Sequence, residues 1–194
     1  MKNLGGEKMG LSETEMREIV YTWREKNPAI VALWYTVQAA AMQAIEGRDA
    51  VINKGLKFSY ELGAMTVRLP SGRKLYYPRA HLGLGKISKT NVIIYEGQNQ
   101  TTKKWEDTEI YGGKLVENIV QAIARDCLAV TIMRLEKLGY PIVFHVHDEI
   151  IAEVPDDGTK TLEEVKGIFK KPIRWAEGLP LKGDGYVTKY YLKD

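Results

Sequence analysis

The sequence predicts an α+β fold, because helix-like and strand-like segments occur in separate blocks. Two segments of helix length open the chain, short strand-like runs fill residues 57–111, and residues 112–194 combine a long helix with a strand pair. With 194 residues and 44% hydrophobic content, the chain can bury a core of its own. We therefore expect an N-terminal helical pair at residues 1–56, a basic, β-rich segment at 57–111, and an antiparallel hairpin packed against long helices at 112–194.

Two consecutive helices are expected at the start of the chain. Ser12 and Glu15 form the S-x-x-E pattern that satisfies free backbone donors at a helix N-terminus. The first helix should end at Asn27, since the residue before Pro28 is pushed away from helical backbone angles. A second helix is expected from Pro28 to about Glu46.

The next segment combines strand-like runs with basic charge. The runs lie at residues 57–60, 65–69, 74–78 and 91–96, with a turn at 70–72. From Arg68 to Lys104 eight basic residues face one acid, Glu96, for a local net charge of +7 against −4 in the rest of the chain. Three tyrosines in this segment, Tyr76, Tyr77 and Tyr95, could stack on bases while the cations bind phosphates. A solvated, loop-rich surface explains the same charges.

The clearest single element is a long helix over about residues 114–138, which Gly139 ends. Its expected apolar stripe consists of Val116, Val120, Ile123, Cys127 and Val130. Asn118, Gln121 and Arg125 project from the opposite side, which is either the solvated face of the helix or the border of a site. After residue 155, we expect a further helix at residues 160–171 and a final strand at 186–192.

The segment that follows the long helix predicts a hairpin with an unusual turn. The runs Ile142 to Val146 and Ile150 to Val154 have strand composition, and His147, Asp148 and Glu149 lie between them. Tight hairpin turns favour glycine, and this one has none, so its residues suit a purpose other than turning. Carboxylates at a rigid tip could hold Mg²⁺ beside a phosphate, although a two-metal site needs carboxylates from more than one segment. A surface turn made soluble by its acids is the alternative.

A second metal hypothesis uses two histidines of the same segment. His145 and His147 are two residues apart and could share a strand face, where they could ligate zinc, iron or manganese in a metal-dependent hydrolase. Together with Gly139 they resemble the start of a cupin metal motif. The match ends at Ile151 and Ala152, where that motif needs a glutamate.

Four segments in order resemble the family A (polymerase I-like) DNA polymerases, most closely their bacteriophage members. "HVHDEIIAEVP" resembles the third conserved motif, a palm hairpin with a His-Asp-Glu tip, and "GGKLVENIVQAIARDCLAVTIMRLEKLGYPIVF" resembles the helix that precedes it. "LPSGRKLYYPRA" resembles the Gly-Arg-Arg/Lys-x-Tyr-x-Pro segment, and "KMGLSETEMREIVYTWREKNPAIVALW" resembles the helical region beyond the nucleotide-binding helix. The likeness covers nearly the whole chain, and implies fingers-type helices at 1–56 and a palm-type sheet at 112–194.

The resemblance implies a catalytic role for the hairpin tip. Asp148 matches the palm aspartate that helps to hold two catalytic Mg²⁺ ions, Glu149 matches its neighbouring acid, and His147 matches a residue near the primer end. Gln121 matches the helix glutamine that reaches the minor groove of the terminal base pairs, where all correct pairs present the same acceptors. The other DNA-binding candidates are Arg125, Asn118, Arg73, Lys74 and Arg79. Glu117 stands where the family often has asparagine.

Two motifs of the family are absent, and would lie upstream. "FSYEL" at residues 58–62 has only fragments of the first palm motif and lacks its aspartate. Lys103 fits the nucleotide-binding helix by spacing, but Asn99 and Asp107 stand where arginine and an aromatic residue are needed. The expected function is thus template-directed addition of deoxynucleotides to primer–template DNA, with an N-terminal polymerase segment as partner and an inactive isolated chain. A non-catalytic DNA-binding module, or a truncated remnant, is the alternative.

The remaining composition fits an intracellular protein. The single cysteine, Cys127, excludes an internal disulfide and a Cys-rich zinc site, and its place in the apolar stripe indicates a buried thiol. We find no signal peptide and no run of eighteen apolar, uncharged residues, so no membrane contact is expected. The expected location is the cytoplasm, that of the host if a phage encodes the chain.

Overall fold

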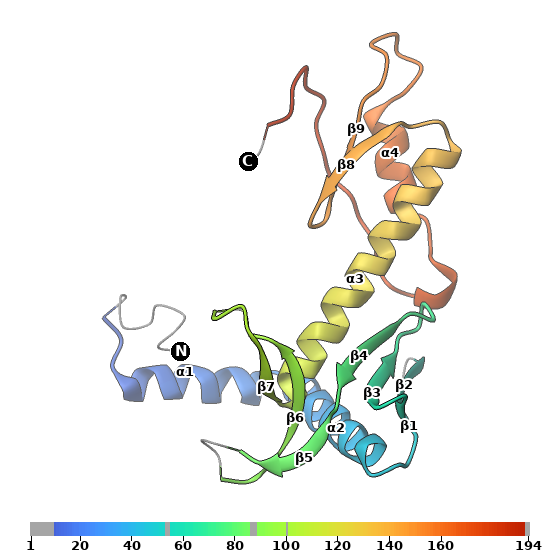
Figure 1. Ribbon diagram of the computed structural model, residues 1–194. Helices are drawn as coiled ribbons and strands as arrows, with labels where there is room; N and C mark the ends of the chain where they lie inside the picture. The colour runs from blue at the N-terminus through green and yellow to red at the C-terminus, as the bar shows by residue number, and fades with distance from the viewer. Residues whose placement is uncertain (1–9, 53–54, 86–88, 100, 193–194) are drawn as a thin grey trace. The chain divides into compact units, whose positions relative to one another are not determined.

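The computed structural model describes residues 10–52, 55–85, 89–99 and 101–192 (Figure 1). It contains helices and antiparallel sheets, which confirms the predicted α+β class. Two compact units divide the chain: a first unit of Met1–Val67 and Lys74–Asn118, and a second unit of Arg68–Arg73 and Ile119–Asp194. The expected division at residues 56 and 111 concerns the parts of a polymerase and stays a prediction.

Helices occupy both units. They are α1 (Glu13–Lys26), α2 (Pro28–Ile45), α3 (Gly112–Lys137) and α4 (Leu162–Phe169), followed by a short 3₁₀ helix at Arg174–Ala176. All four α-helices were expected, and the capping box at Ser12 is formed, because its hydroxyl accepts from the Glu15 amide while the Glu15 carboxylate accepts from the Ser12 amide. The second helix begins at Pro28, which needs no hydrogen-bond partner at that position.

Within the described residues, nine strands form three sheets. The strands are β1 (Ala50–Ile52), β2 (Leu56–Glu61), β3 (Ala64–Arg68), β4 (Lys74–Pro78), β5 (His81–Leu84), β6 (Asn91–Gln98), β7 (Trp105–Ile110), β8 (Ile142–Val146) and β9 (Glu149–Ala152). Their orders are β1-β2-β3-β4 and β5-β6-β7 in the first unit, and β8-β9 in the second. The expected final strand at residues 186–192 is wrong, because that segment pairs with none of the described strands and lies in an irregular conformation.

Helix α2 provides an apolar face for the first unit. It packs against β1 and β2, and Val37, Ala40, Ala41 and Ala44 are buried. By length and composition alone it could also cross a membrane, since its eighteen residues have a mean hydropathy of 1.2, with 22% of them buried. The run is uncharged but not wholly apolar, because it contains Thr36, Gln38 and Gln43, so the expectation that eighteen apolar, uncharged residues nowhere run together is not contradicted. Core helices of soluble proteins pass the same test.

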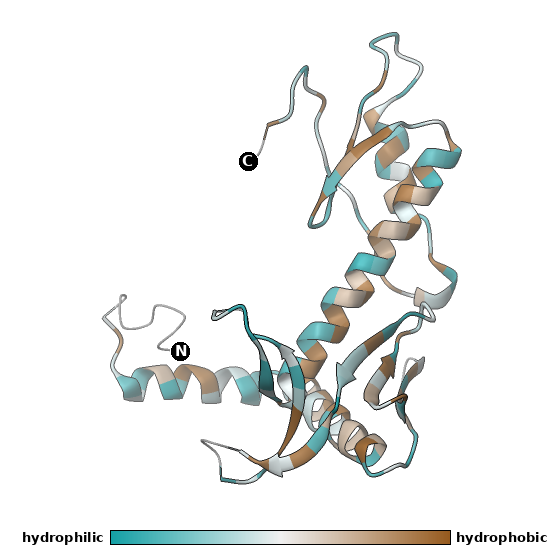
Figure 2. Cartoon of the chain, viewed as in Figure 1, coloured by the Kyte–Doolittle hydropathy of each residue, from teal (hydrophilic) through white to brown (hydrophobic). Residues whose placement is uncertain are grey.

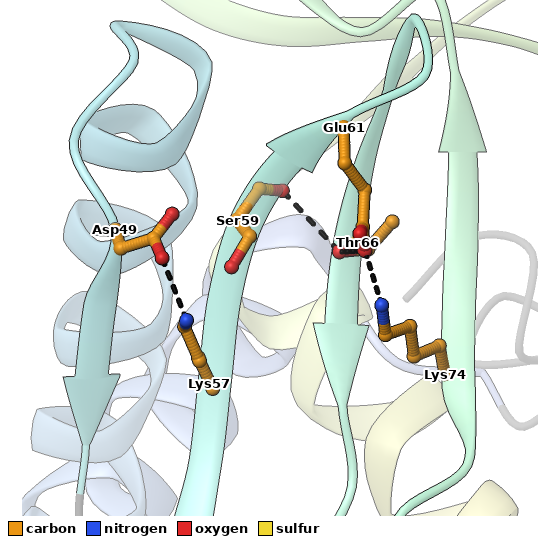
Figure 3. A network of polar contacts seen from close by, with 6 residues as sticks. All are labelled: Asp49, Lys57, Ser59, Glu61, Thr66 and Lys74. Carbon is orange, nitrogen blue, oxygen red and sulfur yellow. Dashed lines mark hydrogen bonds and ion pairs between the residues drawn. The ribbon is translucent and has the colours of Figure 1, made fainter.

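The four-stranded sheet is held by a core on one side and by paired charges on the strands (Figure 3). Phe58, Met65 and Val67 are fully buried. Lys74 on β4 binds the Glu61 carboxylate at 2.6 Å, and the Thr66 hydroxyl donates to the same oxygen at 2.8 Å. These two contacts, the lysine first, lower the pKa of Glu61. Cations and hydroxyls thus satisfy the acids of this sheet.

Helix α3 extends through the boundary between the units. Its buried side includes Leu115, Ile119, Leu128 and Leu135, and Cys127 is the expected buried thiol. The predicted stripe is wrong at Val120, whose side chain is 57% exposed, because the buried positions follow Leu115 and Ile119 instead. The helix ends as expected at Gly139, whose φ of 74° allows the Tyr140 amide to donate to the Leu135 carbonyl.

The second unit has a small core between α3, the hairpin and α4. Leu135, Tyr140 and Ile168 are buried, and the partly buried apolar residues packed on them are Ile142, Ile150, Ala152, Val154, Val165 and Phe169. The Tyr140 hydroxyl donates to the Glu164 carboxylate, which closes this core on the side of α4. One face of the β8-β9 hairpin is therefore packed against this core.

Candidate functional site

The hairpin tip is a two-residue turn made by His147 and Asp148. Val146 and Glu149 are paired directly across it, so Glu149 belongs to β9 and not to the turn. His147 has a φ of 49°, while Asp148 is not among the residues with positive φ. Type II′ turns have this pattern and normally place glycine at the first position. A non-glycine residue in such a conformation is strained, and strain of this kind concentrates at functional sites.

The Asp148 carboxylate lies open to solvent at this tip. Within the described ranges it makes no hydrogen bond or ion pair, and so no cation of the chain neutralises it. Carboxylate oxygen is the ligand that Mg²⁺ prefers, so Asp148 fits one position in the coordination of that ion. Among the described residues no group of three His, Cys, Asp or Glu side chains could hold a metal. A complete site would need carboxylates from elsewhere.

Helix α3 brings Arg125 to the hairpin. His145 and Ile150 are paired across the strands, and Ile150 faces the core, so the His145 side chain lies on the face toward α3. Arg125 Nη2 lies 3.2 Å from His145 Nε2. A guanidinium only donates, so Nε2 is the acceptor in this contact. Gln121 is exposed one helical turn before Arg125, on the same side of α3.

The two histidines do not form the expected pair on one strand face. His145 lies in β8 with Nε2 engaged by Arg125, and His147 lies in the turn. A bulge between Ile142 and Phe144 also interrupts the alternation of side chains along β8. The hydrolase hypothesis thus finds no ligand cluster in the described parts of the chain.

Arg73, a predicted DNA-binding residue, fastens the turn between β3 and β4 onto α3. Its Nε binds Asp126 Oδ1 at 2.6 Å and its Nη2 donates to the Ala122 carbonyl at 2.8 Å. The Ser71 hydroxyl donates to the other oxygen of Asp126. The Asp126 side chain is 12% exposed, so these partners satisfy a carboxylate that has little contact with water.

Three further predicted DNA-binding residues are also paired, in the first unit. Lys74 binds Glu61, Arg79 Nη1 lies 2.9 Å from Glu96 Oε1, and Asn118 Nδ2 donates to the Tyr77 hydroxyl at 3.1 Å. To contact phosphates or bases, each would have to share or leave its partner. Their roles in DNA binding stay predictions.

The three tyrosines expected to stack on bases differ in exposure: Tyr77 is buried, Tyr95 is partly exposed and Tyr76 is exposed. Tyr77 is 4% exposed and meets the Tyr95 ring edge-on at 5.1 Å. Burial raises the pKa of the Tyr77 hydroxyl. Tyr76 remains exposed, so of these three rings it alone is freely accessible to a base.

The local charge of +7 holds only as far as Lys104, and it falls to +4 when the segment is extended to Ile110, because Glu106, Asp107 and Glu109 follow. Strand β7 was missed because its sequence, WEDTEI, is polar, and it pairs with β6. The pairing sets Asp107 opposite Glu96, and Glu106 and Glu109 beside the same strand. The strands of this sheet therefore carry four acids and no Lys or Arg, and the case for a strongly basic surface is weaker than the sequence suggested.

Two aromatic residues at the hairpin were not expected from the sequence. Phe144 on β8 meets the Tyr191 ring edge-on at 5.1 Å, so the C-terminal segment contacts the hairpin. The aromatic residues at 186–192 indicated packing against another element, but we interpreted them as part of a strand. In the structure, Tyr191 packs against Phe144 instead.

The chain is 50% identical over 192 residues to a protein of Bacillus phage SP02 that is named "DNA polymerase". The chain matches one segment of a phage DNA polymerase. The match covers 98% of the chain but 29% of the phage protein, so the chain spans less than a third of its relative's length. The predicted likeness to a phage polymerase is thus confirmed. No family model and no solved structure matches the chain.

Proposed function

We propose that the chain is the C-terminal palm and partial fingers segment of a phage-type family A DNA polymerase. Joined to the rest of that polymerase, it would add deoxynucleotides to the 3′ end of a primer on template DNA. The observation that carries the proposal is the exposed Asp148 carboxylate, unpaired within the described ranges, at a strained hairpin tip. The 50% identity to a phage DNA polymerase supports it.

In this proposal Asp148 holds Mg²⁺ together with a carboxylate from outside the chain. When bound, Mg²⁺ stabilises the charge that develops on a phosphoryl group as a hydroxyl attacks it. The turn fixes Asp148 at the end of a hairpin whose other end is packed in the core of the second unit. Glu149 adds negative charge beside it, and His147 lies next to it at the expected primer end.

The side of α3 that carries Gln121 and Arg125 would contact the terminal base pair. Arg125 gives one N–H to His145 Nε2, which orients the guanidinium and leaves its other donors for the O2 and N3 acceptors of the minor groove. These acceptors are common to all correct base pairs, so such contacts check geometry without reading sequence. The proposed substrates are primer–template DNA and deoxynucleoside triphosphates, and the proposed setting is the host cytoplasm.

The test is a chimera in which this chain replaces the matched segment of the SP02 polymerase. We expect the chimera to extend a primer with Mg²⁺, and Asp148→Asn to abolish extension. Glu153→Gln is the matched control, because Glu153 is an exposed carboxylate at the other end of the same hairpin. We expect no primer extension from the chain alone.

A folded chimera without extension, or full activity of the Asp148→Asn variant, would contradict the proposal. If salt-sensitive DNA binding persisted in the chain alone and Asp148→Asn left it unchanged, the non-catalytic DNA-binding module would be the better description.

A further inference from the structure

The first unit carries a helical arm, residues 13–36, that has almost no core. It consists of α1 and the first half of α2, and Met16 is its one buried residue. Six large apolar or aromatic side chains of the arm are 40–70% exposed: Ile19, Tyr21, Trp23, Ile30, Leu33 and Tyr35. Single exposed apolar residues are common, but this number within 24 residues of helix is not.

The exposed residues form stripes. Ile19 and Trp23 are four residues apart on α1, and Ile30 and Leu33 are three apart on α2, so each pair shares a helix face. Apolar residues along α1 are interleaved with charged ones, whereas residues 28–36 of α2 carry no charged residue (Figure 2). An apolar stripe of this kind normally faces a core.

The arm is held rigidly at its base. The Trp23 and Trp34 rings stack at 5.7 Å across the junction of the helices, and the Asn27 side chain donates to the Trp23 carbonyl at 2.8 Å. Gln38 accepts from the Gly112 amide at 2.9 Å. A Cβ at Gly112 would lie 2.0 Å from the Trp34 carbonyl oxygen, so only glycine permits this close approach of α3. The arm therefore presents a defined surface.

The chemistry of the arm favours a polypeptide over a membrane. Helices that lie on membranes carry mainly Lys and Arg on the polar face. Helix α1 instead has four acids and three basic residues in its 14 positions, which gives no attraction to anionic lipids. A protein interface accommodates mixed charge around aromatic anchors such as tryptophan and tyrosine.

We propose that the helical arm docks onto the part of the polymerase that lies outside this chain. The proposal rests on the proposed polymerase function, and the length of the phage relative supports it, since more than two thirds of that protein is unmatched. The matched segment thus joins a much larger polypeptide that can cover the arm. Trp23, which lies on the α1 stripe, is the expected anchor, because large aromatic side chains dominate interface energies.

The experiment measures binding of the full 194-residue chain to the unmatched part of the SP02 polymerase as a separate polypeptide, by isothermal calorimetry. The arm variant is Ile30→Glu with Leu33→Glu. Its control is Val51→Glu with Leu84→Glu, which changes two exposed apolar residues of the sheets in the same unit. Circular dichroism and thermal unfolding verify that both variants fold.

We expect the wild type and the control to bind equally, and the arm variant to bind at least about tenfold more weakly. Equal binding by the arm variant, or no binding by the wild type, would overturn the proposal. Two further measurements test the other partners that could cover the helical arm. If the SP02 polypeptide does not bind, and the chain sediments with vesicles of equal phosphatidylglycerol and phosphatidylcholine but the arm variant does not, the arm would be assigned to a membrane. If instead the chain dimerises in ultracentrifugation and the arm variant does not, the arm would be assigned to a second copy.

Hydrogen exchange in the chimera gives a second measurement that needs no variant. Residues 13–36 should exchange at least about tenfold more slowly in the chimera than in the chain alone, because the interface would cover them. Unchanged exchange would contradict docking. The two proposals fail separately: docking without primer extension overturns the polymerase function, and primer extension that the arm variant leaves unchanged overturns the docking alone.

Discussion

The acids of the four-stranded sheet and the acid of the hairpin tip have the same chemistry but opposite surroundings. In the sheet, Asp49 binds Lys57 at 2.7 Å and Glu61 binds Lys74 at 2.6 Å. At the tip, Asp148 has no such partner among the described residues and follows a residue of strained conformation. A paired acid supports its sheet, whereas an unpaired acid on a fixed turn is available to an external cation. Pairing thus separates structural from functional candidates better than residue type does.

The largest expected effect is that of Asp148→Asn in the chimera. Primer extension should fall at least about a hundredfold, because an ion that stabilises phosphoryl charge contributes several kcal/mol. The midpoint of urea unfolding should not change, since the exposed Asp148 side chain makes no hydrogen bond or ion pair with a described residue. A lower urea midpoint for Asp148→Asn would contradict the contrast between Asp148, as a functional acid, and the paired acids of the sheet, as structural ones.

The next effect is on stability, at Arg73. Arg73→Ala should lower the free energy of unfolding by about 1–3 kcal/mol, because it removes the Arg73 donors from the Ala122 carbonyl and from the largely buried Asp126 carboxylate, which keeps the Ser71 hydroxyl. Urea unfolding measures this, with the exposed Arg68→Ala as control. Weaker DNA binding at unchanged stability would instead restore the DNA-contact role expected from the sequence.

Replacing the strained turn residue should separate stability from activity. His147→Gly should raise the free energy of unfolding by about 1 kcal/mol, because glycine adopts positive φ without steric cost. Primer extension by the same variant should fall, since the imidazole is gone. His147→Ala loses the ring without that relief, so it should lower extension without a gain in stability. Equal stability of the two variants would contradict strain at the tip.

The smallest effect concerns the pH dependence of the paired sheet. The pKa of Glu61 is lowered in the folded chain, so its pair with Lys74 stabilises the fold fully above the ordinary value of 4.5 and is lost as the pH falls through the lowered value. The thermal midpoint of Glu61→Gln should therefore depend less steeply on pH below 4.5 than that of the wild type. The exposed Glu177→Gln should follow the wild type. Parallel curves for Glu61→Gln would show that the pair contributes nothing.

The helices and the hairpin could be predicted because local chemistry determines them. The Ser12 capping box, the proline at the start of α2 and the Gly139 C-cap each satisfy backbone groups within a few residues. The hairpin followed from two β-branched runs around a short polar insert. The exposure of Asp148 follows from the tight turn. That Asp148 makes no ion pair with a described residue could be seen only in the structure.

The sheets of the first unit could be predicted only in part, because pairing between distant strands overrides local preference. Strand β7 has a polar sequence and forms through its ladder with β6, while residues 186–192 have strand composition but pair with no strand of the described ranges. The pairing of Arg73 with Asp126 joins residues 53 positions apart, which no local pattern reveals. The net charge of residues 68–104 did not predict a strongly basic surface for the same reason, because it left out the acids of β7, which pairs with β6.

The turn that Arg73 fastens has a consequence for dissecting the molecule. This turn is grouped with the second unit, whereas the strands on both of its sides belong to the first. The chain therefore passes between the units three times, and no single cleavage separates them. A fragment that stopped before Ile119 would keep Arg73 and Ser71 but lack Asp126, the carboxylate that they bind. Protein truncated at that boundary should therefore be less stable than the whole chain.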